Sequence, residues 1–488
     1  MIEVIRLIFF LNGKRVEFTS RPAQTALEVL RLLGVNSTKE VCSEGDCGAC
    51  TIALGRWQHS EFRYKAVTAC ILPAARLHNT HVITAEGLGT PDNLHPIQQV
   101  IYENHATQCG FCTPGIIMSI FVLFVGNPSA DLQEFKKALE GNLCRCTGYR
   151  HIVQAGEALI HRVHSGLLET RLFMPLWAKS AENALRNEPF PLTTSLENVP
   201  EYYPVESYTL AESITEVLST LKAEAGKVKI VAGGTDLFVE ANVHKRFHTH
   251  YIDISRIDEL SIISAGKDML TIGATATLAE ILSHPVVKES LPALYEAIDN
   301  MSSTQIRNIA TLAGNIGNAS PIADGATDLL AVSDQVEIIG ETTRCIPLSS
   351  FYMGYKKLNL NPTELITALK IPLKNYNYCG YIKTAKRKNV DIASVSSCFT
   401  LQVDNDGSIL SATLAYGGVK EFPALALKTM QFLIGKKLDE DTISATQDIV
   451  ANGFSPISDV RGSEEYRSEL IRNHLLKHFL RIGEQNND

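Results

Sequence analysis

The sequence lacks the features of three broad classes of protein. No long basic run occurs and the formal net charge of the 488-residue chain is −8, so nothing indicates a nucleic-acid binder. The longest apolar run, IIMSIFVLFV at 116–125, is too short to span a bilayer and favours a buried helix. The N-terminal stretch lacks the basic start, long apolar core and cleavage site of a secretory signal. We therefore expect a soluble, cytoplasmic protein that binds neither membrane nor nucleic acid.

Cysteine is the informative residue type. Of the eleven cysteines, eight fall between Cys42 and Cys146, whereas Cys345, Cys379 and Cys398 are scattered and are expected to be packing residues. In a cytoplasmic chain, clustered cysteines favour metal binding over disulfides. The length predicts about three or four domains.

The first half of the chain predicts two small domains. Strand-like IRLIFFL and RVEF flank Asn12-Gly13, which predicts a hairpin, and Thr25 with Glu28 forms a capping box that starts the helix TALEVLRLLG. Four helical candidates follow from about residue 95 to 165: HPIQQVIYENHA, PGIIMSIFVLFVG, DLQEFKKALEG and HIVQAGEALIHRVHSG. They predict a small helical bundle.

The second half predicts α/β structure after a connection. Residues 166–205 are rich in proline and polar residues, which predicts a connecting segment over the surface. Strand–turn–helix patterns then run to about residue 375, and a smaller α+β region follows. We predict a multidomain α+β chain divided at 1–88, 89–165, 166–205, 206–375 and 376–488.

The first cysteine set is CSEGDCGAC, at 42–50, with a fourth cysteine further on. Cys42, Cys47 and Cys50 are spaced C-x4-C-x2-C, and with Cys70 they follow the plant-type order for a 2Fe–2S cluster. The two glycines of the loop allow the unusual backbone angles with which it can curl around a cluster. A structural zinc site is the alternative, but zinc usually takes two close pairs of cysteines.

The second cysteine set lies between helical candidates. QCGFCTPG supplies Cys109 and Cys112, and NLCRCTGY supplies Cys144 and Cys146. Two packed helices could present both pairs at one end of a bundle, and Pro114 suits the first turn of the helix after the first pair. By itself this pattern suits zinc and a cluster equally. The neighbouring plant-type site favours a second cluster, because two close clusters form an electron wire.

Two glycine-containing stretches could bind a nucleotide. In KIVAGGTDLFVE, at 229–240, an apolar strand runs into a glycine turn whose N–H groups could cradle a pyrophosphate. It is not a GxGxxG fingerprint, so a Rossmann fold is unsupported. QIRNIATLAGNIGNASPIAD, at 305–324, allows close approach of a flat or charged ligand. Without further information, a plain turn is the commoner explanation of such a Gly-Gly-Thr.

Three motifs carry a family resemblance. VCSEGDCGACTIAL, QCGFCTPGII and GNLCRCTGYRHIV resemble the iron–sulfur portion of the molybdenum hydroxylases, which include xanthine dehydrogenase, aldehyde oxidoreductases and carbon monoxide dehydrogenase. The order of the whole chain is similar to the small subunit of a bacterial xanthine dehydrogenase. The resemblance implies a ferredoxin-like β-grasp domain, a four-helix iron–sulfur bundle, an α/β FAD-binding domain and an α+β C-terminal domain.

The resemblance also implies an electron path. Electrons from purine oxidation at a molybdenum cofactor on a large partner subunit would pass to the helical-domain cluster, the ferredoxin-like cluster, FAD and then NAD. Gln108 and Cys146 match positions that approach the pterin of the partner, which places the subunit interface near that cluster. A heterotetramer of two small and two large subunits is implied. No catalytic residue for the hydroxylation is expected in this chain.

The flavin contacts implied by the resemblance fall in five places. Met301 stands where the family often has an aromatic residue near the isoalloxazine. The implied contacts are Ile230, Val231, Ala232, Gly233, Gly234, Thr235, Asp236, Leu237, Met301, Ala310, Thr311, Gly314, Asn315, Ser320, Asp324, Ile366 and Lys383.

Other functions remain open. The same subunit could serve an aldehyde or other N-heterocycle hydroxylase, because substrate contacts would lie on the partner. A stand-alone ferredoxin-type reductase and a zinc-stapled scaffold without a redox role are the alternatives of other classes. The basic run 386–388 is either a solvated patch or a positive field near the flavin that favours an anionic nucleotide.

Overall fold

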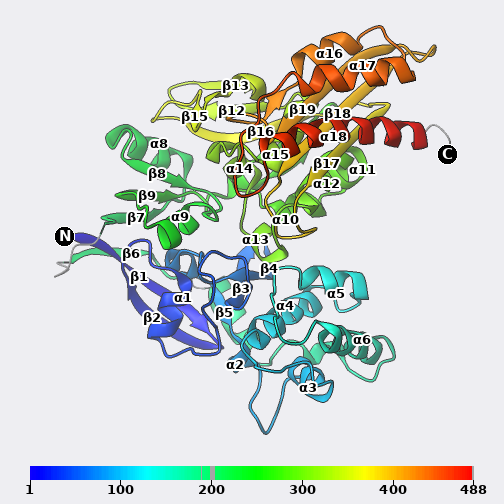
Figure 1. Cartoon of the computed structure of the whole chain (residues 1–488). Helices are drawn as coiled ribbons and strands as arrows, with labels where there is room; N and C mark the ends of the chain where they lie inside the picture. Colours follow the sequence, from blue (N-terminus) through cyan, green and yellow to red (C-terminus); the bar gives the residue numbers. More distant parts are fainter. Residues whose placement is uncertain (188, 198–203, 486–488) are drawn as a thin grey trace. The chain divides into compact units, whose positions relative to one another are not determined.

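A computed structural model describes residues 1–187, 189–197 and 204–485 (Figure 1). The chain divides into two compact units, each assembled from separate stretches of sequence. The first unit comprises Met1–Ala211, Lys227–Asp253 and Ser303–Ile309, and the second comprises Glu212–Gly226, Ile254–Ser302 and Ala310–Asp488. In the part of the chain that the structure describes, no helix is long and apolar enough to cross a bilayer.

The first unit begins with a mixed sheet, shown in blue in Figure 1. Its strands run in the order β2-β1-β5-β3-β4, and β6 pairs with the other end of β1. Leu11 pairs with Lys14 across the Asn12-Gly13 turn, where both turn residues have positive φ, so the predicted hairpin is confirmed. The strands are β1 (Ile2–Leu11), β2 (Lys14–Ser20), β3 (Thr51–Gln58), β4 (Glu61–Thr68), β5 (His81–Ile83) and β6 (Thr193–Glu197).

Helix α1 (Ala26–Leu32) covers this sheet. The predicted capping box is present, since the Thr25 side chain accepts from Glu28 N while the Glu28 carboxylate accepts from Thr25 N. Leu27 and Leu30 are buried in one core with Phe9 of β1 and further sheet residues. The buried leucines of this helix therefore contribute to the core, at about 25 cal/mol for each Å² of apolar surface removed from water.

The four predicted helices of the next region are all present. Helix α4 is apolar on every side and lies in the centre of this region's core, with Phe121 and Phe124 fully buried. Pro114 lies in its first turn, as predicted. The helices of this region are α2 (Ala85–Leu88), α3 (Pro96–Glu103), α4 (Thr113–Gly126), α5 (Leu132–Ala138) and α6 (Arg150–His164).

The segment 166–205 contains more regular structure than we expected. It forms α7 (Ala178–Asn187) and strand β6, together with a short 3-10 turn at Thr170–Leu172. In α7, Ala178, Ala181 and Leu185 form a buried helical face that the proline-rich stretch after it obscured. Residues 188 and 198–203 of the predicted connection lie outside the described residues.

A small parallel sheet completes the first unit. Its order is β7-β9-β8, and Val231 at the end of β8 pairs with Asp253 at the end of β9. Helix α9 follows β8, and α13 comes from a later part of the chain. These elements are β7 (Ser207–Leu210), β8 (Val228–Val231), α9 (Leu237–His244), β9 (His250–Asp253) and α13 (Thr304–Arg307).

The second unit contains two larger antiparallel sheets. The first has the order β10-β11-β16-β12-β13, and the second has the order β17-β18-β19-β20. The strands are β10 (Ile263–Ala265), β11 (Met269–Gly273), β12 (Gln335–Ile339), β13 (Thr343–Pro347), β14 (Tyr352–Gly354), β15 (Lys357–Leu358), β16 (Leu365–Pro372), β17 (Tyr378–Thr384), β18 (Val395–Val403), β19 (Ile409–Gly417) and β20 (Ala424–Leu425).

Helices cover these sheets. All nine residues of α15 are buried, and this helix contacts β18 and β19, while α12 contacts β17. The helices are α8 (Ile214–Ala223), α10 (Leu278–Ser283), α11 (Pro285–Ser290), α12 (Pro292–Asp299), α14 (Leu312–Asn318), α15 (Asp324–Val332), α16 (Leu427–Leu433), α17 (Glu440–Ala451) and α18 (Glu464–Gln485).

Candidate iron–sulfur and flavin sites

The four cysteines of the first set converge. Three lie in the loop between α1 and β3, and Cys70 lies just after β4. The Cys42 thiol contacts those of Cys47 and Cys70, and the Cys70 thiol also contacts that of Cys50. The contacts with Cys47 and Cys70 lower the pKa of Cys42, while the contacts with Cys42 and Cys50 raise that of Cys70. Thiolates this close together repel one another, and a bound cation would offset their negative charge.

The glycines of this loop are required by its shape. Gly45 has φ +86° and Gly48 has φ +63°, a region that L side chains rarely adopt. A Cβ on Gly48 would lie 2.3 Å from the carbonyl oxygen of Gly141, and one on Gly45 would lie 2.8 Å from Ile71 Cδ1. The curled loop that the motif predicts is therefore present; a Cβ on Gly48 would meet backbone, whereas one on Gly45 would meet the ends of isoleucine side chains.

The second set also converges, at the ends of two helices. Cys109 and Cys112 lie just before α4, and Cys144 and Cys146 lie in the segment before α6. The Sγ atoms of Cys109 and Cys146 are 3.5 Å apart, and the thiols of Cys112 and Cys144 also contact each other. Burial and the contact with Cys144 raise the pKa of Cys112 to about 12. Cys109 and Cys146 are exposed, whereas Cys144 is buried.

The thiols of the two sets differ in the pattern of their contacts. Among the residues that the structure describes, no three His, Cys, Asp or Glu side chains are arranged to hold a single metal ion. The thiols of the second set meet in two pairs, whereas those of the first set form one series of contacts, from Cys47 through Cys42 and Cys70 to Cys50. The assignment of these eight residues as cluster ligands stays a prediction.

The two cysteine loops touch each other. The N–H of Leu143 donates to the carbonyl of Cys47 over 2.9 Å, and Asn142 Nδ2 donates to the carbonyl of Gly48 over 3.0 Å. Gln305 of α13 donates through Nε2 to Asn142 Oδ1 and to Ser119 Oγ, at 3.0 and 2.9 Å. A backbone hydrogen bond thus links the residue before Cys144 to a cysteine of the other set.

The first unit holds the glycine turn predicted to bind the flavin. Strand β8 ends at Val231, the turn covers Ala232–Asp236, and α9 begins at Leu237. Gly234 has φ +79°, so this turn needs glycine for its conformation. The predicted contacts Ile230 and Val231 lie at the end of the strand. A strand, a glycine turn and a helix follow one another here, which is the order of elements in a phosphate-binding turn.

The second unit holds the other predicted flavin residues. Ala310 and Thr311 precede α14, where the Thr311 side chain accepts from the N–H of Gly314 at 3.0 Å. Asn315 Oδ1 is buried and has no hydrogen-bond partner among the described residues. Such a buried acceptor could accept a hydrogen bond from a bound ligand. Ser320 lies in the turn between α14 and α15. The small residues of this stretch thus leave a polar atom unsatisfied within the protein.

Lys383 and Asp324 form a buried ion pair in the second unit. Lys383 Nζ lies 2.8 Å from Asp324 Oδ2 and donates to the carbonyl of Asn300 at 2.9 Å, which places it beside the residue before Met301. The Tyr381 hydroxyl donates to Asp324 Oδ1 at 2.6 Å. The sequence did not single out Tyr381, although its place two residues before Lys383 on one strand puts both side chains on one face. Ile366 lies on β16.

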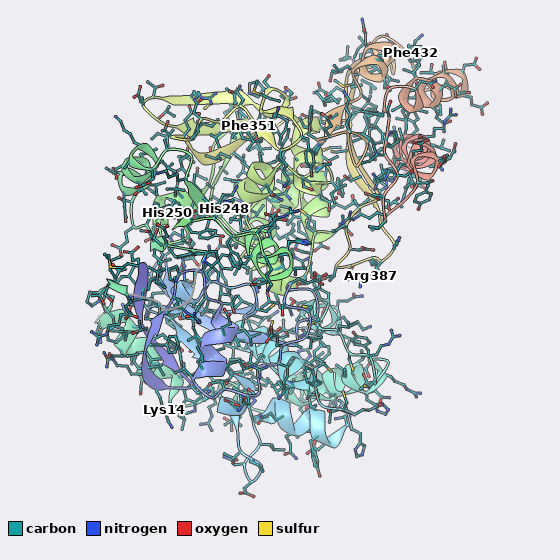
Figure 2. The ribbon with its side chains drawn as sticks, turned by 60° about the vertical axis from the view of Figure 1, so that its left-hand side comes forward. Lys14, His248, His250, Phe351, Arg387 and Phe432 are labelled. Atoms are coloured by element: carbon teal, nitrogen blue, oxygen red, sulfur yellow. The ribbon has the colours of Figure 1, made fainter. Side chains whose placement is uncertain are left out.

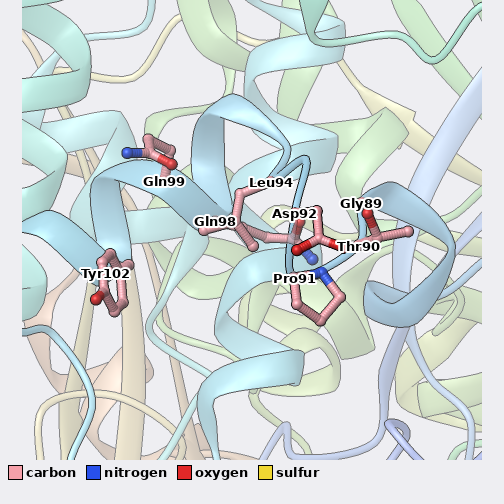
Figure 3. A pocket seen from close by; sticks show the side chains of 8 residues that line it. All are labelled: Gly89, Thr90, Pro91, Asp92, Leu94, Gln98, Gln99 and Tyr102. Carbon is pink, nitrogen blue, oxygen red and sulfur yellow. The ribbon is translucent and has the colours of Figure 1, made fainter.

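Two surface features contain none of the predicted cofactor residues. The basic run lies in the loop between β17 and β18, where Arg387 is exposed (Figure 2) and Lys386 donates to the carbonyl of Val460 at 2.8 Å. A hollow of about 680 Å³ lies where the segment 89–94 meets α3, with Gln98 and Tyr102 in its wall (Figure 3). Neither feature places charged side chains around a buried binding site.

Four domain families match the chain in succession. They are the 2Fe-2S iron-sulfur cluster binding domain at residues 9–75, the [2Fe-2S] binding domain at 84–157, the FAD binding domain in molybdopterin dehydrogenase at 203–374, and the CO dehydrogenase flavoprotein C-terminal domain at 380–482. Each cysteine set lies wholly inside one iron–sulfur match. The chain carries the iron–sulfur and FAD-binding domains of the molybdenum hydroxylase family. The predicted multidomain α+β fold class is confirmed.

The curated relatives of this chain carry several names. Xanthine dehydrogenase/oxidase of Rattus norvegicus is 29% identical over 98% of this chain and 39% of its own length. Aldehyde oxidase 1 of Bos taurus is 31% identical over 98% of this chain and 39% of its own length. The chain thus spans about two fifths of the length of the curated relatives it matches.

Solved structures support the same fold. Quinoline 2-oxidoreductase from Pseudomonas putida 86 aligns with a TM-score of 0.54 at 25% identity, over 57% of this chain and 97% of that chain. Reconstituted CO dehydrogenase from Oligotropha carboxidovorans aligns with a TM-score of 0.54 at 25% identity, over 58% of this chain and 99% of that chain. The names differ in substrate, and each alignment extends over little more than half of this chain.

Proposed function

We propose that this chain is the electron-transfer subunit of a xanthine dehydrogenase. It works with a large subunit that carries the molybdenum cofactor, in a heterotetramer of two small and two large subunits. Hypoxanthine and xanthine are oxidised to urate on the large subunit, and NAD takes up the electrons at the flavin of this chain. The four domain matches and the order of the motifs support this proposal.

The observation that carries the proposal is the contact between the cysteine loops. The hydrogen bond from Leu143 N to Cys47 O places the residue beside Cys144 against a cysteine of the other set. Two independent structural metal sites would need no such contact. A relay requires the two centres to lie close together, because single electrons must pass between them, and the contact between the loops favours this.

The residues of this chain hold and tune the cofactors. The eight cysteines would bind two 2Fe–2S clusters, and the turn Ala232–Asp236 of the first unit would hold the pyrophosphate of FAD. When bound, these groups supply one-electron carriers and a two-electron acceptor that can reduce NAD. The buried pair of Lys383 and Asp324 fixes a positive and a negative charge beside Asn300.

The partner subunit is expected to cover the second cysteine set. Cys109 and Cys146 are exposed, and Phe111 and Leu143 beside them keep 47% and 57% of their surface exposed. Exposed apolar side chains around an exposed metal site are typical of a face that a partner covers. Gln108 lies in the same loop, at the position that the resemblance assigns to the pterin.

An aldehyde or another N-heterocycle is the second candidate substrate. The similarity to Aldehyde oxidase 1 of Bos taurus extends over as much of this chain as the similarity to the xanthine dehydrogenases. Because substrate contacts would lie on the large subunit, a substrate panel decides between them. The native complex should be isolated with this chain as bait and assayed with hypoxanthine, an aldehyde and quinoline, each with NAD.

Metal analysis separates the relay from a zinc-stapled scaffold. Anaerobically prepared protein should hold about four irons per polypeptide, with iron–sulfur and flavin bands in the visible spectrum, and the native complex should contain molybdenum. Zinc without visible bands would contradict the redox function. A chain with iron and flavin that isolates without a molybdenum partner would favour a stand-alone reductase.

A further inference from the structure

A buried arginine joins the first cysteine set to the glycine turn. Arg76 follows Cys70 by six residues, is 8% exposed, and lies in the 3-10 turn Ala74–Leu77. Its Nε donates to Asp253 Oδ2 at 2.7 Å and its Nη2 donates to Asp253 Oδ1 at 3.1 Å. The same guanidinium donates to the carbonyl of Gly233 at 3.0 Å and to that of Ala232.

These two carbonyl contacts fix the direction of two N–H groups. The described residues contain no cis peptide bond, and in a planar trans peptide the C=O and the N–H point in opposite directions. Since Arg76 holds the carbonyls of Ala232 and Gly233, the N–H groups of Gly233 and Gly234 both point away from it. Within the described residues, neither N–H donates to another backbone group. Two adjacent N–H groups on one side of a turn form an anion-binding concavity.

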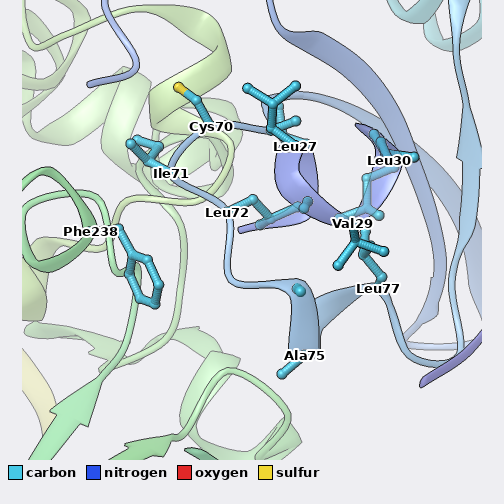
Figure 4. Close-up of a cluster of buried hydrophobic side chains, with 14 of the residues drawn as sticks. Leu27, Val29, Leu30, Cys70, Ile71, Leu72, Ala75, Leu77 and Phe238 are labelled. Atoms are coloured by element: carbon cyan, nitrogen blue, oxygen red, sulfur yellow. The ribbon is translucent and has the colours of Figure 1, made fainter. Parts of the chain in front are cut away.

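The helix after the turn is held by the same domain. Asn242 of α9 donates through Nδ2 to the carbonyl of Cys70 at 2.7 Å and to that of Ser43 at 3.1 Å. Phe238 of α9 is 1% exposed and packs in one core with Ile71 and Leu72 (Figure 4). The segment that begins at Cys70 therefore contacts both the glycine turn and the helix that follows it.

We propose that Arg76 is a positioning residue of the flavin site, supplied by the ferredoxin-like domain. It holds the two peptides of Ala232–Gly234 so that their N–H groups meet the pyrophosphate of FAD. This inference rests on the proposed function, which assigns the turn to the flavin. Arginine suits the task because its planar fork reaches a carboxylate and two carbonyls at once, whereas lysine has a single point of charge.

The experiment uses the full chain with the substitutions Arg76→Lys and Arg76→Met. We expect the Kd for FAD to rise at least tenfold in both, while iron per chain stays at the wild-type value. At saturating FAD, the phosphorus NMR signals of the bound pyrophosphate should shift in Arg76→Lys. A purely structural role would lower stability without moving the phosphorus signals.

Arg467→Met is the matched control. Arg467 is also a buried arginine, with Nη2 2.6 Å from Asp459 Oδ1, but it belongs to the second unit and contacts no predicted flavin residue. This variant should keep the wild-type FAD affinity and phosphorus signals.

The outcomes separate this inference from the proposed function. Wild-type affinity for FAD in Arg76→Met would overturn the role of Arg76 and leave the proposed function standing. A wild-type chain that binds no FAD would instead contradict the proposed function. If Arg76→Met does not fold, Arg76→Lys decides, because it keeps a positive charge beside Asp253; unchanged FAD affinity and phosphorus signals in it would also overturn the inference.

Discussion

The two cysteine sets are alike in number and differ in burial. In the first set, Cys47, Cys50 and Cys70 are buried, whereas in the second both Cys109 and Cys146 are exposed. Cys50 and Cys70 of the first set lie in the core with α1 and the mixed sheet, and Cys144 of the second set lies in the core around α4. Under the proposed function, this difference in burial assigns the enclosed set to electron exchange within the chain and the open set to the face that the partner covers.

Loss of the second site should have the largest effect. Cys146→Ser should remove the helical-domain cluster and lower iron from about four to about two atoms per chain. Substrate-driven reduction of the flavin should stop, while NADH oxidation by artificial acceptors should persist, because the flavin lies after both clusters in the proposed path. Cys345→Ser, at an exposed cysteine outside both sets, is the control and should change neither activity. Loss of both activities in Cys146→Ser would contradict the proposed order.

Chelation tests the difference in burial directly. We expect an iron chelator to remove iron from the second set at least ten times faster than from the first, because Cys109 and Cys146 are open to solvent. Two cluster signals followed by EPR in the isolated chain give the two rates. Equal rates, or faster loss from the first set, would show that exposure of the thiols does not control access.

Two glycines make a matched comparison of packing. Gly48→Ala should lower the free energy of unfolding by about 2–4 kcal/mol, because a Cβ would lie 2.3 Å from a carbonyl oxygen at positive φ. Gly110→Ala, at φ +81°, meets only Thr107 Oγ1 at 3.8 Å and should cost about 1–2 kcal/mol, the strain of its backbone alone. Denaturant titration of both variants measures the two costs. Similar values would contradict the tighter packing assigned to the first loop.

The second unit, which lacks both cysteine sets, should lose stability in acid. His474 and His478 of α18 are buried, and Ser397 Oγ forms a hydrogen bond with each of them, at 3.0 and 2.9 Å. Burial lowers the pKa of His474 to about 3 and that of His478 in the same direction, and Lys477 and Arg481 add to both shifts. Because the unfolded state binds protons below about pH 6.5 and the folded state does not, stability is complete above that pH and falls below it.

We expect about 2–3 kcal/mol to be lost between pH 7.5 and 5.5 through these two histidines. The double variant His474→Gln, His478→Gln should lose that part of the pH dependence, and denaturant titration at both pH values measures it. An equal pH dependence in wild type and double variant would show that these histidines do not titrate on unfolding.

Local patterns predicted most of the elements and both cysteine sites. The Asn12-Gly13 hairpin, the capped helix at Thr25 and the four helices around the second set depend on neighbours in the sequence. Cysteine spacing identified the thiols that converge, because ligands of one centre must lie within a short reach of each other. Roles for individual flavin residues came from family resemblance and stay predictions.

Long-range pairings could not be predicted in this way. Arg76 and Asp253 are 177 residues apart, and no periodicity connects them. The short helix α13 belongs to the first unit although the stretches before and after it belong to the second. Its Gln305 contacts Asn142 beside the second cysteine set, a pairing that only the folded chain reveals. The short buried face of α7 was hidden by the proline-rich stretch that follows it.

The central claim is that two iron–sulfur clusters lie against each other in the first unit. EPR of the fully reduced, anaerobically prepared chain tests it most directly. Two signals of equal weight that split each other at low temperature are predicted, because the loops of the two sets share a backbone hydrogen bond. A single signal, two signals without mutual splitting, or no signal from a zinc-containing protein would contradict the claim.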